Sequence, residues 1–126
     1  MTIINLTQHP ATPEQIEAGV VDLPPDLRAT LTKLLTFDTR PTFEDVQDRA
    51  EAIALLADSV LDEVAGVAAM LGGAPFLMAP LERALIDKCI EPMYAFSRRV
   101  SVEEPQPDGS VRKVNIFKHA GFVHTA

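Results

Sequence analysis

The stretch of residues 66–99 constrains the fold most, because it combines two strand-like runs with a helical pattern. Residues 66–73 form an apolar run that ends in two glycines, and residues 74–88 place apolar side chains at helical spacing. After a break at residues 91–92, residues 93–102 are predicted to form a second strand. The face of the helix directed inward is expected to contain Phe76, Leu77, Leu81, Leu85 and Ile86. This β-α-β unit predicts parallel strands with a right-handed crossover.

Helix caps, glycines and prolines delimit the other segments. Residues 12–15 and 42–45 match capping boxes, which mark helix starts. A tight turn at residues 107–109 returns the chain as an antiparallel strand. The remaining predicted elements are strands at residues 2–6, 20–23 and 111–123 and helices at residues 12–18, 24–35 and 42–61. The order β-α-β-α-α-β-α-β-β predicts one three-layer α/β domain over residues 1–126, with a mostly parallel sheet and an antiparallel C-terminal hairpin.

Charge and composition restrict the functional class. The net charge of −7 argues against binding long nucleic acid but leaves room for a small anionic ligand in a local basic pocket. The single cysteine, Cys89, excludes an intramolecular disulfide and fits a reducing compartment. No apolar run reaches the roughly 18 residues of a membrane span, and the first residues lack the charged start of a signal peptide. We therefore expect a cytoplasmic protein that does not associate with membranes.

Candidate ligand contacts fall where the predicted parallel strands end. Ligands of such sheets bind beyond the carboxyl ends of the strands, which here are Gly72-Gly73 and Ser97-Arg98-Arg99. Glycines allow close approach to the backbone, and the following helix start offers free N–H groups to an anion such as phosphate. The alternative is a simple tight turn, since neither a G-x-G-x-x-G pattern nor a Walker lysine is present.

His9 follows the first predicted strand and should lie at the same rim. It is a candidate ligand contact or general base. The alternative is a surface histidine before a proline.

The hairpin turn predicts which residues of the last two strands lie opposite each other. A turn centred on residues 107–109 places Ser97 opposite His119 and Arg98 opposite Lys118, on opposite faces of the sheet. The first pair could activate or orient a hydroxyl, and the second could bind phosphate. Alternatively, the serine and histidine satisfy each other and the cations are solvated. The histidines and Cys89 show no metal-ligand spacing, so we expect neither a metal site nor a cofactor.

Several short motifs resemble a known family. They are HPATPEQ from His9, LP from Leu23, the glycine pair at Gly72, PMYAFSR from Pro92 and DGSVRKVNIFKH from Asp108. In this order they are similar to small CRISPR-associated proteins related to the CARF sensor domain.

The resemblance implies a Rossmann-like homodimer that binds cyclic oligoadenylate. Some members of that family cleave the ring without a metal and thereby switch off the antiviral response. In such a protein Gly73 and the next helix start, with Ser97, Arg98, Lys118 and His119, could supply the anion site. Together with the strand-end and hairpin arguments, this makes Ser97 and His119 candidate catalytic groups, and His9, Gly72, Gly73, Arg98 and Lys118 candidate ligand contacts. Two hypotheses follow: a ring nuclease, or a non-catalytic nucleotide- or partner-binding module with the same fold. Ring size, nucleobase and turnover are left open.

Overall fold

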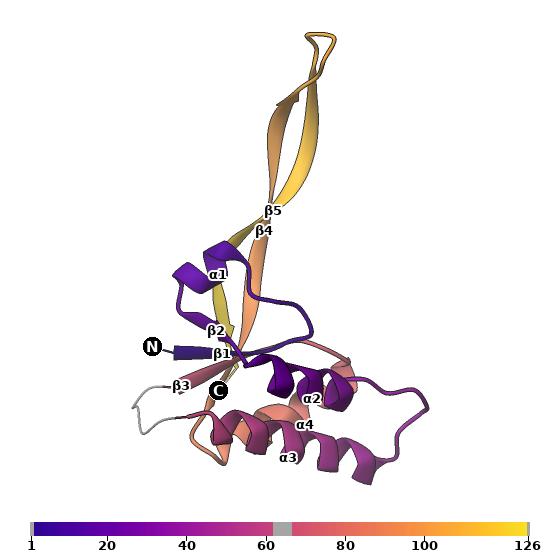
Figure 1. The fold of residues 1–126 in the computed structure, drawn as a ribbon. Helices are drawn as coiled ribbons and strands as arrows, with labels where there is room; N and C mark the ends of the chain where they lie inside the picture. Colours follow the sequence, from indigo (N-terminus) through magenta and orange to yellow (C-terminus); the bar gives the residue numbers. More distant parts are fainter. Residues whose placement is uncertain (1, 62–66, 126) are drawn as a thin grey trace.

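A computed structural model describes residues 2–61 and 67–125 (Figure 1). The strands are β1 (Thr2–Leu6), β2 (Val20–Asp22), β3 (Val67–Leu71), β4 (Glu91–Pro105) and β5 (Val111–His124). The helices are α1 (Pro13–Glu17), α2 (Pro25–Leu35), α3 (Phe43–Ser59) and α4 (Pro75–Ile86). The element order predicted from the sequence is confirmed.

The described strands form one five-stranded sheet in the order β2-β1-β3-β4-β5. The pairs β1–β2, β1–β3 and β3–β4 are parallel, whereas β4–β5 is antiparallel. The protein is therefore an α/β protein with a mostly parallel sheet and an antiparallel edge. The predicted parallel arrangement of β1, β3 and β4 is confirmed.

Local side-chain bonds explain two of the helix starts. Thr12 accepts a bond from the N–H of Gln15 at 3.2 Å, and the Gln15 side chain accepts one from the N–H of Thr12 at 3.0 Å. Thr42 and Asp45 make the same reciprocal pair at the start of α3. Both predicted capping boxes are confirmed, because this motif depends only on residues three apart.

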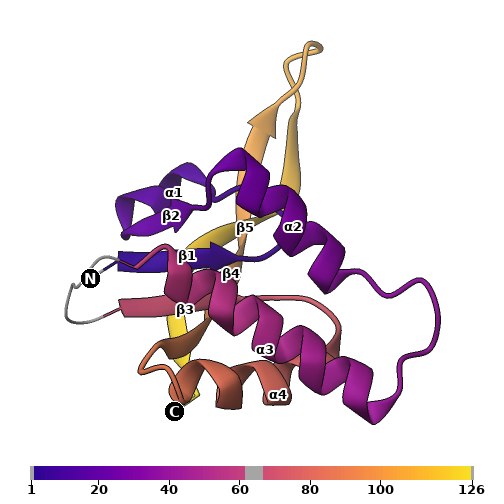
Figure 2. The same cartoon turned by 60° about the horizontal axis from the view of Figure 1, so that its bottom comes forward.

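The two faces of the sheet carry cores of different size. The larger cluster joins residues of β1 and β3 to α2, α3 and α4, which lie together over one face (Figure 2). The smaller cluster, on the other face, consists of Ile3, Val20, Ala68, Met70 and Met93, with Ala11 and Phe122 packed against it. Alternation along the strands explains the division, since Ile3 and Ile4, or Ala68 and Ala69, point to opposite faces.

Some details of the sequence-based prediction are wrong. In α4 the buried row is Leu77, Leu81 and Leu85, whereas Phe76 and Ile86 are 45% and 46% exposed, because they lie one position away from that row. The long helix ends at Ser59 rather than near residue 61. Pro92 does not precede β4 but belongs to it and pairs with Ala69 of β3. It is tolerated there because β5 pairs with β4 only from Met93 onward.

The antiparallel hairpin extends far beyond the sheet. β3 pairs with β4 only up to Met93, whereas the β4–β5 ladder continues to Pro105 and Val111. Residues 97–118, which we call the arm, project away from the helices as a two-stranded ribbon (Figure 1). A register shift separates the arm from the base of the hairpin, where Gly121 has a φ of 109°. No helix in the described part of the chain is long and apolar enough to cross a membrane.

Candidate functional site

An open cleft lies at the carboxyl ends of the parallel strands. Its volume is about 590 Å³. It is lined by Thr7, Gln8, His9, Pro10, Thr12, Gln15, Met70, Leu71, Gly72, Gly73, Ala74, Tyr94 and Ala95. We call this the rim cleft. Three segments far apart in the sequence meet there: the loop after β1, the turn after β3 and the first third of β4.

The strand order explains why the sheet opens at this point. From β1 the chain passes through α1 to β2, whereas from β3 it passes through α4 to β4 on the other side. The connections that leave these two adjacent strands therefore diverge. Such a divergence leaves a crevice beyond the strand ends, which is the usual ligand position in open α/β sheets.

Asn5 holds the loop that carries His9. Its side chain is buried within β1 and makes four hydrogen bonds. The amide Nδ2 donates to the His9 carbonyl oxygen and to Asp22 Oδ1, both at 2.8 Å. The Oδ1 atom accepts from the N–H and the hydroxyl of Thr7 at 2.9 and 2.7 Å. Because Asp22 Oδ1 also accepts from the N–H of Ala11 at 3.0 Å, the loop is tied at both ends.

The opposite wall of the rim cleft is backbone. A Cβ atom at Gly72 would lie 3.2 Å from Thr7 Cγ2, so a side chain there would press on the loop after β1. Gly73 has a φ of 150°, which L side chains rarely adopt. α4 begins immediately afterwards, and no side chain caps its first turn, where Pro75 lacks an N–H. The N–H of Leu77 already donates to the Ala74 carbonyl oxygen at 3.0 Å. This wall therefore consists of the backbone of Gly72, Gly73 and Ala74, next to the positive end of the α4 dipole.

Tyr94 contributes an aromatic ring that is anchored from behind. Its hydroxyl donates to Glu82 Oε2 of α4 at 2.8 Å. Burial, followed by this hydrogen bond, raises the pKa of Tyr94 well above its ordinary value of 10.0. The side chain is therefore a neutral donor and a fixed apolar wall of the cleft.

The Ser97–His119 and Arg98–Lys118 pairs predicted from the hairpin turn are both present in the ladder. None of these four residues lines the rim cleft. Ser97 follows Ala95 by two residues on β4, so it faces the same side of the sheet as that part of the cleft. The His119 ring packs against Phe122 at 5.1 Å between centroids, and its Nδ1 is buried without a hydrogen-bond partner among the described residues. By the same alternation, Arg98 and Lys118 face the opposite side.

The structure thus brings together His9, Gly72 and Gly73, and it places Ser97 and His119 further along the hairpin on the same side. The sequence analysis missed Asn5, Asp22 and the wall formed by Tyr94. An asparagine inside an otherwise apolar strand was the available signal, because a buried amide requires several partners. Within residues 2–61 and 67–125, no group of three potential metal ligands is present.

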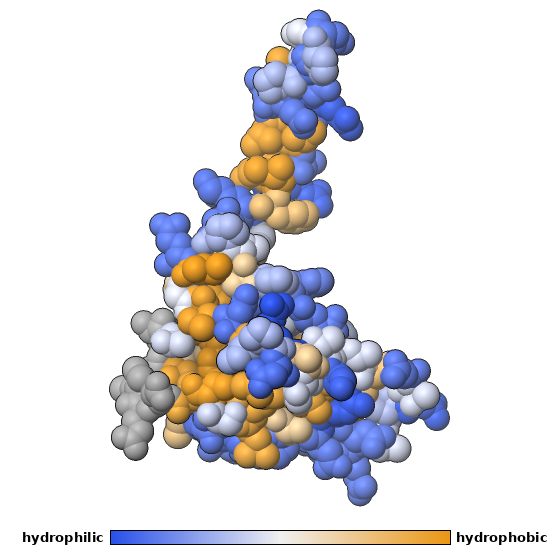
Figure 3. Space-filling view, viewed as in Figure 1, coloured by the Kyte–Doolittle hydropathy of each residue, from blue (hydrophilic) through white to orange (hydrophobic). Residues whose placement is uncertain are grey.

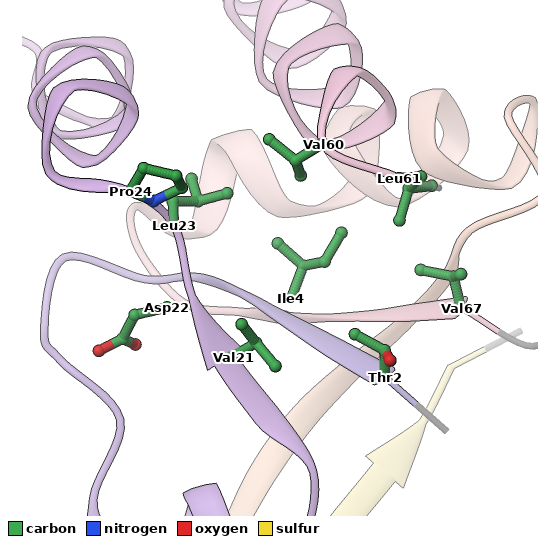
Figure 4. A pocket seen from close by; sticks show the side chains of 9 residues that line it. All are labelled: Thr2, Ile4, Val21, Asp22, Leu23, Pro24, Val60, Leu61 and Val67. Atoms are coloured by element: carbon green, nitrogen blue, oxygen red, sulfur yellow. The ribbon is translucent and has the colours of Figure 1, made fainter. Parts of the chain in front are cut away.

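A second pocket, of about 330 Å³, lies between the sheet and the end of α3 (Figure 4). Aliphatic side chains from β1, β2, β3 and residues 60–61 surround it. Its charged lining residue, Asp22, is engaged by Asn5 and Ala11. Leu61 and Val67, which line this pocket, are the last and first described residues on either side of residues 62–66. The rim cleft, whose lining is described throughout, is therefore the candidate site.

The fold and the rim cleft define an α/β protein whose open site lies at the carboxyl ends of a mostly parallel sheet. A family model described as the uncharacterized protein MJ1673 family matches residues 1–123, and the chain belongs to this family. No curated protein matches the sequence significantly. No solved structure matches it significantly either.

Proposed function

We propose that the protein binds a small anionic nucleotide in the rim cleft, with a cyclic oligoadenylate as the first candidate ligand. The observation that carries this proposal is the position of the cleft where the connections from β1 and β3 diverge. The strand order agrees with a Rossmann-like, three-layer arrangement, which we propose as the fold class. The choice of ligand rests on the motif resemblance described above.

The cleft can recognise a nucleotide without a cation among its lining residues. The backbone at Gly73, close to the positive end of the α4 dipole, suits a phosphate oxygen, and the Tyr94 ring offers an apolar surface to a base. His9, held by Asn5, supplies an imidazole at the opposite wall. Arg98 and Lys118 remain a predicted basic pair on the other side of the hairpin.

The proposed reaction is metal-independent cleavage of a phosphodiester bond. The ribose 2′-oxygen attacks phosphorus and loses its proton to a base, and the bond from phosphorus to the 5′-oxygen breaks as that oxygen gains a proton. The products are a 2′,3′-cyclic phosphate and a 5′-hydroxyl. Ser97 and His119 are the groups proposed to orient the 2′-hydroxyl and to transfer protons, because they face the same side as Ala95.

A second candidate is a non-catalytic nucleotide-binding module. This alternative is favoured by the absence of Ser97 and His119 from the described cleft lining. Fold alone does not decide between the two.

Incubation with cyclic tetra-adenylate or hexa-adenylate in EDTA distinguishes the candidates. Linear products indicate the ring nuclease, whereas binding without turnover indicates the module. Ser97→Ala and His119→Ala should reduce the single-turnover rate more than the affinity if these groups act on the reacting oxygen. Equal turnover in wild type and both variants would contradict their catalytic role.

The proposal includes a homodimer, because a cyclic oligonucleotide with two-fold symmetry fits between two related rims.

A further inference from the structure

The arm has one apolar face and one polar face. The cross-strand pairs Val100–Ile116 and Val102–Val114 lie on one face. The pairs Ser101–Asn115 and Glu103–Lys113 lie on the other, where Arg99 also stacks over the ring of Phe117 at 5.6 Å. Phe117 and Val111 are the apolar residues on this second face. Alternation in the middle of the arm, from residue 100 to 103, is typical of a ribbon that buries one face. We call Val100, Val102, Val114 and Ile116 the aliphatic face.

Within the described residues, the aliphatic face is not covered by any helix. α2, α3 and α4 pack on the body of the sheet, and the arm projects away from them (Figures 1 and 2). Ile116 is 44% exposed, and an apolar band crosses the middle of the arm (Figure 3). An isolated two-stranded ribbon is marginally stable in water, so this arm needs a covering surface.

The charges of the arm indicate what covers it. On the same side of the ribbon as the aliphatic face, Arg98 lies directly opposite Lys118, a like-charge pair that is unfavourable in an isolated ladder. Neither cation forms an ion pair with a residue in the described ranges. Residues 97–118 carry five cationic and three acidic side chains, whereas the rest of the chain carries six and fifteen. The arm is therefore basic and the body strongly acidic.

The body offers a matching surface on α3. Glu44, Asp48, Glu51, Leu55 and Asp58 are spaced four and three residues apart and are all exposed. Glu51 is paired with Lys88 at 2.7 Å. Leu55 provides an apolar centre between acidic groups. It complements the aliphatic face, which is followed on the same side of the ribbon by the Arg98–Lys118 pair at one end and the Glu104–Arg112 pair at the other.

We propose that two copies of the chain clasp each other, with the aliphatic face of each arm lying on the outer row of α3 in the other copy. Reciprocal contact satisfies two-fold symmetry. A ribbon about 10 Å wide and about 30 Å long presents about 300 Å² per face. Contact between the two arms alone would bury about 600 Å² in total, whereas two arm-to-body contacts bury about 1,200 Å², the lower limit of a stable interface. This dimer does not depend on the ligand of the rim cleft.

Sedimentation and light scattering across a range of concentrations test the proposal. We expect a mass of about 27 kDa, twice the 13.7 kDa of one chain. Val102→Lys should weaken the dimer at least tenfold, whereas the matched control Ser101→Lys, on the polar face, should leave it unchanged. A monomeric wild type, or equal effects of the two substitutions, would overturn the proposal. Circular dichroism checks that each variant is folded.

Charge reversal tests which surface the arm contacts. Arg98→Glu with Lys118→Glu should weaken self-association, as should Glu44→Lys with Asp48→Lys. A mixture of the two double variants should restore the dimer, because each reversed surface then meets an opposite charge. If reversal of the arm cations tightens self-association, or if the mixture remains monomeric, the arm does not lie on α3 and the proposal fails.

Discussion

Substitution of Asn5 by alanine should destabilise the protein and loosen the loop that carries His9. The change removes four hydrogen bonds from a buried side chain. Two partners keep other bonds, since Asp22 still accepts from Ala11 and the Thr7 hydroxyl still reaches the His9 carbonyl oxygen at 3.1 Å. The N–H of Thr7 loses its partner.

The expected cost is a decrease of about 2–4 kcal/mol in the free energy of unfolding, because each net bond contributes about 1 kcal/mol and an unsatisfied buried donor costs about 1–3 kcal/mol. Urea unfolding followed by circular dichroism measures this value, with Asn115→Ala on the exposed arm as a matched control. The control should change stability by less than about 0.5 kcal/mol. If Asn5→Ala costs no more than the control, the network does not hold the loop.

Three further predictions concern backbone strain and ionisation. Gly73→Ala should lower the free energy of unfolding by about 1–2 kcal/mol, because the φ of 150° is unfavourable for alanine. An unchanged midpoint of urea unfolding would contradict this prediction. Hydrogen bonding with Thr42 lowers the pKa of Asp45 below its ordinary value of 3.8, so the stability that this carboxylate contributes is lost as the pH falls below 3.8. Asp45→Asn should reduce that loss. If the free energy of unfolding falls with acid identically in the variant and the wild type, the Asp45 carboxylate does not contribute to the pH dependence. Burial, with the bond to Glu82, raises the pKa of Tyr94 above its ordinary value of 10.0. This single tyrosine should therefore ionise only above pH 10.0, and stability should fall as the pH rises further. A tyrosinate absorbance midpoint at pH 10.0 would contradict the burial of the hydroxyl.

Local signals in the sequence predict much of the fold. Capping boxes, glycines and prolines mark element ends through interactions within a few residues, and all nine elements were predicted in order. The hairpin register was also predictable, because the turn at residues 107–109 determines which residues lie opposite each other. The surroundings of Phe76 were not predictable, since its ring packs edge-on against Phe37 at 5.0 Å, a contact between distant segments.

The candidate site was predictable only in part. The strand-end rule placed His9, Gly72 and Gly73 at one rim, and the structure brings them into one cleft. The hydrogen bond between Asn5 and Asp22 joins neighbouring strands through side chains seventeen residues apart. The hydrophobic periodicity of the sequence therefore does not predict it. The projection of the arm also depends on where β3 stops pairing with β4, which no local pattern indicates.

Calorimetric titration with cyclic tetra-adenylate and hexa-adenylate in EDTA tests the central claim most directly, using the wild type, His9→Ala and the control His124→Ala. His124 lies outside the rim cleft, paired with Glu91 at 2.6 Å. The account predicts saturable binding of one of the two rings by the wild type and the control, and about 3–10-fold weaker binding by His9→Ala, the effect of one lost hydrogen bond. Absence of binding by the wild type, or equal affinity in the wild type and His9→Ala, would contradict a nucleotide site in the rim cleft.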